Sequence, residues 1–457
     1  MFAEMRAVSR AQPTRSGRFA RSVIALPFLG ILCVPLECLG GLPIEHWQTS
    51  AGARVYFVAS HDLPMLDVSI DFPAGSARDT RDRAGLASLT QRLMRLGADS
   101  MDEDEIARQV ADVGASLTTT FDLDRAGYAL RTLSSDTEQR QALGVLARVL
   151  QSPAFPAAVL EREKARVVAA LKEADTRPDA IAARDFMGSV FRDHPYALRS
   201  AGEPLTIASL SRDDLESFYR AHYVADRAVV AIVGDASRAR AEQIAEELTR
   251  GLPRAVDALV PLPPVAPLTA AVEREIEHPS AQAHILIGQP GLARQDPDYF
   301  PLWVGNYVLG GGGLSSRLSE QVRQKRGLSY TVYSAFVPYQ LPGPFQIGLQ
   351  TRGDQAKEAL AVVREVLREF VASGPSEREL EAAKQNIVGG FALRTDTNRK
   401  VHDYVRVIGY YRLPLDYLDT FTARVEAVTV EQIREAFKRR IQPGRMVTVL
   451  VGAKAVQ

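Results

Sequence analysis

The sequence predicts an α+β fold made of two homologous halves. Residues 210–219 and 428–437 share one pattern, residues 227–234 and 445–452 share another, and both pairs are 218 residues apart. In each half the first segment is typical of an amphipathic helix that begins at an acidic turn. The second is typical of a buried strand of β-branched residues that ends at glycine. An internal duplication explains both matches.

The order of segments is also shared earlier in each half. Residues 160–164 match residues 380–384 at an offset of 220, which a two-residue insertion explains. Each half mixes expected strands with long helices, so we predict two α/β-sandwich domains. The expected strands include residues 55–58, 66–72, 283–288 and 345–350.

Chain length and proline content suggest the domain boundaries. A chain of 457 residues has room for two domains of about 200 residues each. Residues 259–268 contain four prolines, which favour an extended, stiff connector. We therefore predict a first domain over residues 44–258, a linker over 259–268 and a second domain over 269–457.

The overall charge argues against two classes of partner. The chain has 55 basic and 55 acidic residues, so its formal net charge is zero. A balanced chain has no electrostatic footprint for nucleic acid or for an anionic membrane surface. We therefore expect neither as a partner.

The first forty residues are predicted to be an export signal. Five arginines precede an apolar run at residues 23–36, as in a bacterial signal peptide. A helix of this length spans only about 21 Å, short of the roughly 30 Å hydrocarbon core, so a permanent anchor is the weaker interpretation. Gly40 and Gly41 offer a cleavage region, whereas Glu37 makes lipidation at Cys38 unfavourable. We expect a periplasmic or secreted protein with no stable membrane span.

The two cysteines of the chain, Cys33 and Cys38, both lie in this segment. A mature chain without the segment would contain no thiol, no disulfide and no cysteine metal ligand. Thiol chemistry is therefore excluded for the mature protein.

Four stretches of the sequence resemble the pitrilysin family of metallopeptidases, which includes insulin-degrading enzyme and the mitochondrial processing peptidase. The resemblance covers about residues 44–455, and no one stretch would be convincing alone. The four stretches are Phe72-Pro-Ala-Gly-Ser-Ala-Arg-Asp79; His194-Pro-Tyr196 with Gly202; Phe218-Tyr-Arg-Ala-His-Tyr223 with Val233-Gly-Asp235; and Leu309-Gly-Gly-Gly-Gly-Leu-Ser-Ser-Arg-Leu318 with Arg326-Gly-Leu-Ser-Tyr330.

The resemblance implies an inverted zinc motif, His-x-x-Glu-His, on a helix of the first domain. Residues at i and i+4 share a helix face, so both histidines can bind zinc while the glutamate acts as general base. Here the lead-in, residues 84–87, is kept, but the motif positions hold Ser88, Gln91 and Arg92. A guanidinium stays protonated and would repel a cation. We expect these three residues to form a solvated helix face.

The third family ligand, a glutamate further along the chain, aligns with Ala170. All four functional groups are therefore missing, and we expect no metal cofactor in this chain. The resemblance then implies a homologous partner subunit that bears His-x-x-Glu-His and zinc. Together the two chains would form a heterodimer that encloses a chamber for peptide substrates.

The resemblance assigns a different role to the second domain. In active members an arginine and a tyrosine seven residues apart project toward the zinc, and Arg323 and Tyr330 match this spacing. The pair would bind the substrate backbone, and the phenol would donate to the oxyanion. We expect Arg323 near the end of a helix that starts at Ser315 or Ser316, and Tyr330 after the turn at Gly327. The structural alternative is an exposed helical arginine and a core tyrosine.

Two further groups of residues need an interpretation. The glycine run is a candidate peptide-binding loop at Gly311, Gly312 and Gly313, although simple turn geometry is favoured. It lacks the lysine and hydroxyl of a P-loop, so nucleotide binding is not expected.

No two histidines are placed at i and i+4 around a carboxylate, and a metal site assembled in space is left open. The histidines are His46, His61, His194, His222, His278, His284 and His402.

Two functions remain compatible with the sequence. In the first, the chain is the non-zinc-binding subunit of a heterodimeric metallopeptidase and supplies Arg323 and Tyr330 in trans. In the second, it is a structural or peptide-binding scaffold, as are the silent family members of a respiratory complex. An independently active hydrolase would need a nucleophile and a base, and none is identifiable.

Overall fold

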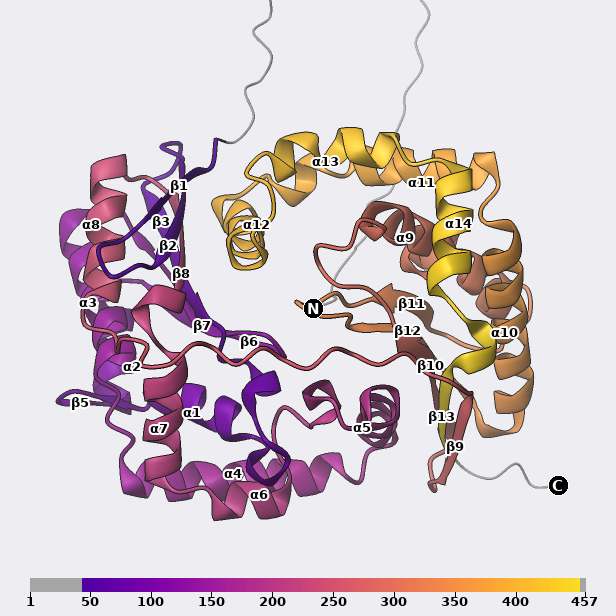
Figure 1. The fold of residues 1–457 in the computed structure, drawn as a ribbon, viewed down its shortest axis with the longest axis horizontal. Coiled ribbons are helices and arrows are strands. Elements are labelled where there is room, and N and C mark those ends of the chain that lie inside the picture. The colour runs from indigo at the N-terminus through magenta and orange to yellow at the C-terminus, as the bar shows by residue number, and fades with distance from the viewer. Residues whose placement is uncertain (1–42, 453–457) are drawn as a thin grey trace, which may run out of the picture. The chain divides into compact units, whose positions relative to one another are not determined.

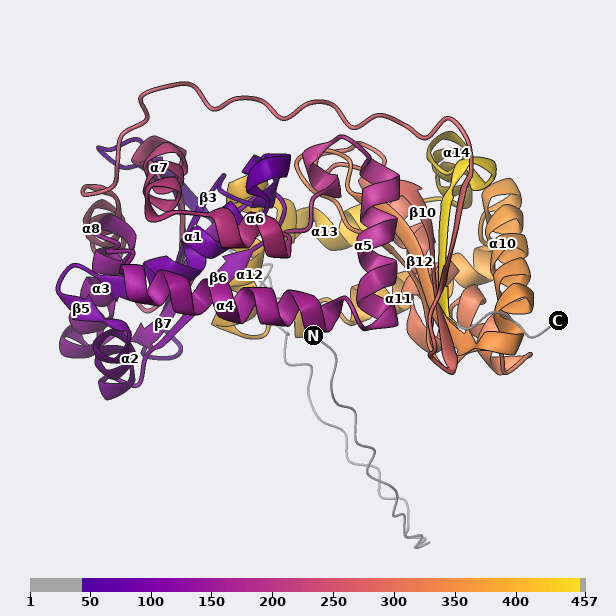
Figure 2. The same cartoon turned by 90° about the horizontal axis from the view of Figure 1, so that it is seen from below.

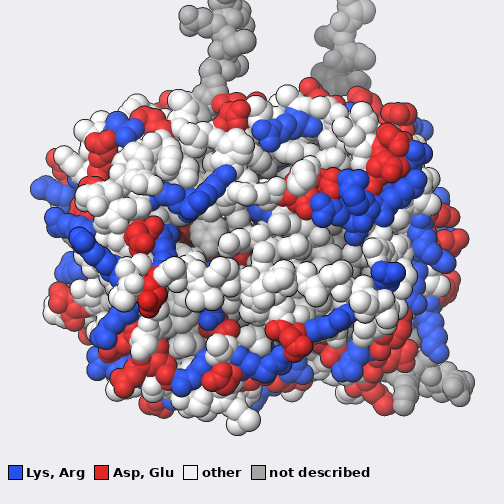
Figure 3. Space-filling model, in the orientation of Figure 1, with Lys and Arg blue, Asp and Glu red and all other residues white. Residues whose placement is uncertain are grey.

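The computed structural model describes residues 43–452. The predicted signal peptide, including both cysteines, lies outside the described residues. No helix within the described part of the chain combines the length and the apolar character that crossing a bilayer requires. On the face drawn in Figure 3, basic and acidic side chains are interspersed and uncharged residues dominate the centre.

Each half is built around one mixed sheet (Figure 1). The strand order is β1-β2-β8-β3-β7-β6 in the first sheet and β11-β12-β10-β13-β9 in the second. The first sheet contains β1 (Glu45–Gln48), β2 (Arg54–Ala59), β3 (Met65–Phe72), β6 (Ser116–Phe121), β7 (Ala126–Leu133) and β8 (Val229–Gly234). The second contains β9 (Val272–Glu277), β10 (Gln282–Pro290), β11 (Val332–Phe336), β12 (Pro344–Arg352) and β13 (Val447–Gly452). A small hairpin pairs β4 (Gly97–Ala98) with β5 (Met101–Asp102).

The helices of the two halves also follow one plan. The first half has α1 (Leu86–Met94), α2 (Glu103–Asp112), α3 (Asp136–Gln151), α4 (Ala157–Ala174), α5 (Pro178–Phe191), α6 (Pro204–Ser209), α7 (Arg212–His222) and α8 (Arg238–Thr249). The second has α9 (Tyr299–Asn306), α10 (Ala356–Ser373), α11 (Glu377–Gly389), α12 (Asn398–Tyr411), α13 (Tyr417–Glu426) and α14 (Val430–Arg440). Residues 251–271, which join the halves, contain no helix or strand.

The predicted duplication is confirmed by the topology. In spatial order, β2, β8, β3, β7 and β6 correspond to β9, β13, β10, β12 and β11. The pairs β2–β8 and β9–β13 are both parallel, whereas the other pairs in this core are antiparallel. The repeated helices α7 and α14 both begin with a capping box, at Ser211 and Thr429, which satisfies the first backbone amides.

The two halves exchange equivalent helices across their interface. Helix α5 of the first half packs on β10 and β13 of the second sheet, and α12 of the second half packs on β8, β3 and β2 of the first (Figures 1 and 2). Phe186 and Val190 of α5 share a core with alternate β13 residues, Val447, Val449 and Val451. Position in the chain therefore does not decide which sheet a helix covers.

Helix α12 approaches the first sheet closely. Val405 and Ile408 pack against Tyr56 and Val229, residues that face away from the core formed by α1, α3 and α8. At Gly409 a Cβ atom would lie only 2.7 Å from the Tyr56 ring, so a larger residue would push the helix off the sheet. Alternating strand residues thus build one core on each face of the first sheet.

A buried ion pair fixes α12 to the first sheet. Arg406 donates to both carboxylate oxygens of Asp71 on β3, at 3.0 and 2.7 Å, and also to the hydroxyl of Thr120. Burial alone would raise the pKa of Asp71, but Arg406 and Arg125 hold it below its usual value. The folded state therefore favours the ionised carboxylate.

We expect Asp71→Asn to lower the unfolding free energy by about 3–5 kcal/mol, because it leaves the buried Arg406 charge without its partner. Urea denaturation at neutral pH measures the change. The pKa of Asp71 is lower in the folded protein than in the unfolded chain. The ionised carboxylate therefore stabilises the fold fully above the pKa of an unfolded aspartate, and this stabilisation is lost as the pH falls through the folded pKa. The difference in unfolding free energy between the wild type and Asp71→Asn should therefore become smaller in acid.

The matched control is Asp354→Asn, which removes a carboxylate from an exposed ion pair with Arg352. Exposed pairs contribute about 1 kcal/mol at most. Equal denaturation midpoints for the two variants would contradict the role of Asp71.

Candidate functional site

Helix α1 is held at its start by a buried carboxylate. Asp79 accepts hydrogen bonds from the backbone amides of Gly85 and Ala87, both at 2.8 Å. Gly85 has φ of 94° and lies against Gly202, where a Cβ atom would approach within 2.8 Å. The structure therefore brings together three predicted motif residues, which position the helix.

Gln91 is buried rather than solvated, so the expectation of a solvated helix face was wrong for this residue. Its side-chain amide donates to the carbonyl oxygens of Thr120 at 2.6 Å and Gly127 at 2.9 Å. Ser88 is half-buried, and its hydroxyl donates to the carbonyl oxygen of Gly85 at 3.1 Å. Gln91 reaches carbonyls of the sheet because α1 packs directly on β7, whereas the hydrogen bond of Ser88 stays within the first turn of its own helix.

Arg92 is exposed, as expected for a solvated helix face, and it is also ion-paired. Its Nε atom donates to Glu163 on α4 at 2.6 Å. Glu163 is buried, with only 1% of its side chain exposed, and also accepts from Arg162 at 3.2 Å and Arg166 at 2.9 Å. Ala170 lies two helical turns further along α4 and is exposed.

Arg92, at one of the predicted motif positions, belongs to a cationic cluster: Arg92, Arg162 and Arg166 surround the single carboxylate of Glu163. Arg162 has a second acidic partner, Glu103, so one positive charge remains in excess. Guanidinium groups donate hydrogen bonds but cannot donate electron pairs, so these residues do not fit zinc. Within residues 43–452, no group of three or more His, Cys, Asp or Glu side chains is arranged to hold a metal ion.

Sequence reasoning missed the role of Glu163. The signal available was its position between Arg162 and Arg166 on a predicted helix, together with a replaced histidine at Arg92. Spacing places Glu163 and Arg166 on one helix face, but only the packing of α1 on α4 brings Arg92 to the same carboxylate.

Arg323 and Tyr330 lie together, as the predicted pair requires. The guanidinium of Arg323 sits over the Tyr330 ring, 4.6 Å from its centroid. Tyr330 is 81% exposed and is therefore not a core aromatic. Neither side chain has a hydrogen-bond or ion-pair partner among the described residues, so their polar groups are free for a ligand.

The segment before this pair contains the expected helix, with a wider turn than a regular α-helix. The helical segment begins directly after Ser316, with residues 317–318 in α-helical and Ser319–Gln324 in π-helical conformation, so Arg323 lies near its end. The turn at Gly327 is present with φ of 63°. Wide π-helical turns are frequent at functional positions.

Arg326 is engaged elsewhere, in contrast to Arg323. Its Nη1 atom donates to the backbone and side-chain oxygens of Gln321, both at 2.9 Å. The neighbouring charges Lys325 and Glu320 pair with each other at 2.8 Å. Arg323 is therefore the one guanidinium of this segment that stacks on Tyr330.

Close packing accounts for most of the glycine run. A Cβ atom would lie 2.4 Å from Ser334 at Gly310, 2.8 Å from Asn306 at Gly311 and 2.7 Å from a carbonyl oxygen at Gly312. Gly313 has open space around it but a φ of 62°, which side chains rarely adopt. Turn geometry explains these residues, and peptide binding by Gly311, Gly312 and Gly313 stays a prediction.

The histidines are dispersed over the two halves. Four contact backbone carbonyl oxygens, and one pairs with Asp235 at 2.8 Å. Burial lowers the pKa of His222 and of His402 to about 4, so both rings are neutral at physiological pH. The carbonyl contacts are made by His46, His194, His278 and His402.

Comparisons with known proteins match this geometry to one family. The family model "Insulinase (Peptidase family M16)" matches residues 54–203, and "Peptidase M16 inactive domain" matches residues 209–387. The non-peptidase homolog YmxG of Helicobacter pylori is 24% identical over 406 residues, which cover 88% of this chain and 93% of that protein. The uncharacterized zinc protease YmxG of Bacillus subtilis is 25% identical over 359 residues, 78% of this chain and 86% of that protein.

A solved structure extends the comparison to nearly the whole chain. The crystal structure of a peptidase M16 inactive domain from Pseudomonas fluorescens matches with a TM-score of 0.87 and 36% sequence identity. The match covers 91% of this chain and 98% of that one.

We expect Glu163→Gln to lower the unfolding free energy by about 1.5–3 kcal/mol, because three guanidinium groups lose their shared carboxylate. Thermal and urea denaturation measure the loss. Glu161→Gln on the same helix removes a 69% exposed carboxylate paired with Lys164, and should change stability by less than about 0.5 kcal/mol. An unchanged midpoint for Glu163→Gln would show that the cluster does not fasten α1 to α4.

Proposed function

This chain belongs to the peptidase M16 family as a non-catalytic member, and from that premise we propose that it is the zinc-free subunit of a two-chain metallopeptidase. In this proposal a homologous partner carries His-x-x-Glu-His and the zinc. This chain contributes one wall of the peptide chamber together with Arg323 and Tyr330. The exposed, stacked pair of Arg323 and Tyr330 carries the proposal.

The environment of Tyr330 suits a group that meets its ligand from outside the chain. A phenol that is 81% exposed contributes little to the core of its own chain, and its hydroxyl can donate to an acceptor brought by a partner or a substrate. The stacked Arg323 presents further donors beside it and limits the directions in which the ring can turn. Such a pair can hold a peptide carbonyl and stabilise the negative charge that develops on its oxygen.

The cationic cluster supports a division of labour between two chains. Arg92 occupies a position that holds a zinc ligand in active members, and its charge is fixed there by Glu163. A divalent cation would have to displace that ion pair and overcome its repulsion by three guanidinium groups. The metal-dependent steps therefore belong to the partner in this proposal.

A scaffold without catalytic contribution is the second candidate. It is favoured by the name of the Helicobacter pylori relative, a non-peptidase homolog. A scaffold requires the buried groups that hold the fold, but it has no use for a phenol whose hydroxyl is unpaired and exposed. The two candidates therefore differ in what they expect of Tyr330.

We expect the chain alone to bind no stoichiometric zinc and to cleave no peptide. In the complex reconstituted with a zinc-bearing homologue encoded beside it, Tyr330→Phe should lower kcat by about 10- to 1000-fold, the range one oxyanion donor supplies. Arg323→Ala should mainly raise KM, because backbone positioning precedes the transition state. Steady-state kinetics measures both effects.

The control is Arg326→Ala, since that side chain is hydrogen-bonded to Gln321 and should leave turnover near the wild-type value. Size-exclusion chromatography checks that every variant assembles. Wild-type turnover in an assembled Tyr330→Phe complex would leave only the scaffold function.

The proposed compartment is the periplasm or the exterior of the cell. We expect the mature protein in the extracytoplasmic fraction to begin near Gly41, because cleavage would follow the apolar run of the signal. N-terminal sequencing of the fractionated protein measures this, with a known cytoplasmic enzyme as the fractionation control. A full-length chain found only in the cytoplasm would refute the export proposal.

A further inference from the structure

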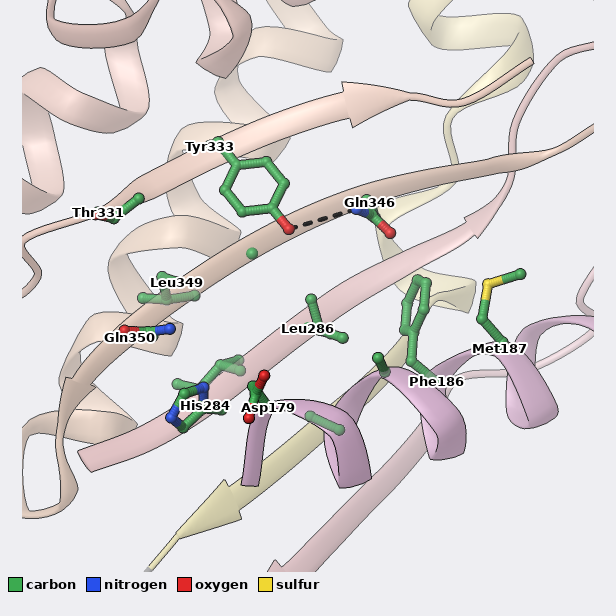
Figure 4. Close-up of a pocket in the computed structure, with 14 residues that line it drawn as sticks. Asp179, Phe186, Met187, His284, Leu286, Thr331, Tyr333, Gln346, Leu349 and Gln350 are labelled. Carbon is green, nitrogen blue, oxygen red and sulfur yellow. Dashed lines mark hydrogen bonds between the residues drawn. The ribbon is translucent and has the colours of Figure 1, made fainter. Parts of the chain in front are cut away.

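A cavity of about 280 Å³ lies on the second sheet, between its inner face and the exchanged helix α5 (Figure 4). Its floor includes Leu286 of β10, and its wall includes Phe186 and Met187 of α5. Tyr333 of β11 forms the opposite side. Because α5 comes from the first half of the chain, the cavity depends on the exchange of helices.

Strand alternation explains why this face of the sheet is partly open. On β10, Ile285 and Ile287 belong to the core of the second half, whereas His284 and Leu286 face the cavity, which Ile285 also borders. Leu286 is only half-buried, so an apolar surface remains accessible beneath α5. An accessible apolar floor favours a ligand with an apolar body.

An aromatic ring already marks one side of the cavity. The Tyr333 ring lies over Gly348 of β12, where a Cβ atom would come within 2.6 Å of it. The glycine therefore lets this ring lie flat along the sheet, with its hydroxyl 3.4 Å from the side-chain amide of Gln346. A second ring placed beside it can stack on Tyr333 or meet it edge-on.

The volume limits the size of the occupant. The cavity volume of about 280 Å³ is close to the lower end of the roughly 300–1,000 Å³ typical of sites for small molecules. One large side chain fits the available space. The cavity is therefore suited to one residue of a peptide.

The polar groups at one end select among such residues. His284, Asp179 and Gln350 lie together at this end in Figure 4. The side chains of His284 and Gln350 have no hydrogen-bond partner among the described residues. Burial lowers the pKa of His284, an effect that Asp179 only partly offsets, so the ring is neutral and offers one acceptor and one donor. The carboxylate of Asp179 is already paired with the guanidinium of Arg177, at 3.3 and 3.0 Å, so it adds little net charge at this end.

The neighbouring strand offers a place for the peptide backbone. Strand β11 is the last strand of its sheet and pairs only with β12 within residues 43–452. Thr331 and Tyr333 both line the cavity, and Thr331 follows Tyr330 directly in the chain. A peptide held at Tyr330 can therefore continue along the free edge of β11.

We propose that this cavity binds a tyrosine side chain of the peptide, with the ring against Leu286 and Tyr333 and the hydroxyl toward His284. The inference rests on the proposed function, because it assigns a substrate residue to the same chamber. Phenylalanine would fill the apolar part but leave the polar end unpaired. An aliphatic residue would lose the contact with the Tyr333 ring as well.

Equilibrium binding to the purified chain tests the proposal without the partner. The probes are short, acetylated alanine-serine peptides with tyrosine, phenylalanine, leucine or alanine at one guest position, followed by fluorescence anisotropy. We expect the tyrosine peptide to bind about 10- to 100-fold more tightly than the alanine peptide, as expected for partial burial of one aromatic ring.

Two variants separate the cavity from the rest of the surface. Ala183→Leu adds volume at an exposed α5 position that lines the cavity, and should reduce the tyrosine preference to near unity. Ala361→Leu makes the same change at an exposed position of α10 outside the cavity, and should leave the preference intact. His284→Leu should keep phenylalanine binding but remove the preference for tyrosine over phenylalanine, which we expect to be about 10-fold in the wild type.

Equal binding of the tyrosine and alanine peptides overturns the cavity proposal. The same holds if Ala183→Leu and Ala361→Leu show the same preference for tyrosine, or if no peptide binds. None of these results changes the kinetic test of Tyr330, which uses turnover by the assembled pair. Conversely, if turnover by the assembled pair does not depend on Tyr330, the purified chain can still bind tyrosine peptides selectively. The failure of one proposal can therefore be distinguished from the failure of the other.

Discussion

The exchange of α5 and α12, fixed by the buried Asp71–Arg406 pair, is the constraint on which the rest of the structure depends. Arg406 reaches β3 from the opposite half of the chain, so the ion pair joins segments 335 residues apart in sequence. A second buried carboxylate, Asp124, accepts from the hydroxyls of Tyr196 at 2.7 Å and Tyr411 at 2.9 Å, which come from different halves. Polar groups buried in this way have few alternative partners, so they specify one arrangement of the halves.

Polar pairing of the same kind also holds α1, the helix that resembles the zinc-motif helix of active family members. In an active member the metal links two helices of the first domain, and its removal would leave that link open. Here Arg92 and Glu163 join α1 to α4, while Gln91 bonds to the carbonyls of the adjoining sheet. The replacements satisfy hydrogen bonds and pair charges, which is what a buried helix interface demands once the cation is absent.

Local pattern and spacing predicted much of this structure, and long-range packing set the limit. The duplicated helix and strand segments were identifiable because capping residues and runs of β-branched residues that end at glycine are local signals. The proximity of Arg323 to Tyr330 followed from a seven-residue spacing supplied by family resemblance. The burial of Gln91, the pairing of Arg92 and the exchange of α5 depend on contacts between segments distant in sequence, which no local pattern encodes. The wide turn at residues 319–324 was likewise invisible to a 3.6-residue period.

Burial separates the residues that hold the fold from those free to serve a partner. Asp71, Arg406 and Glu163 are enclosed and paired, so each has a complete structural explanation within this chain. The pair of Arg323 and Tyr330 has no such structural explanation. A stacked contact between exposed side chains contributes only about 0.5–1 kcal/mol to the stability of the fold. The free donors of that pair lie just before β11, which also bounds the open cavity beneath α5. The proposed recognition of an external peptide gives both features a physical reason, and under that proposal the working surface of this chain lies around β11 rather than around α1.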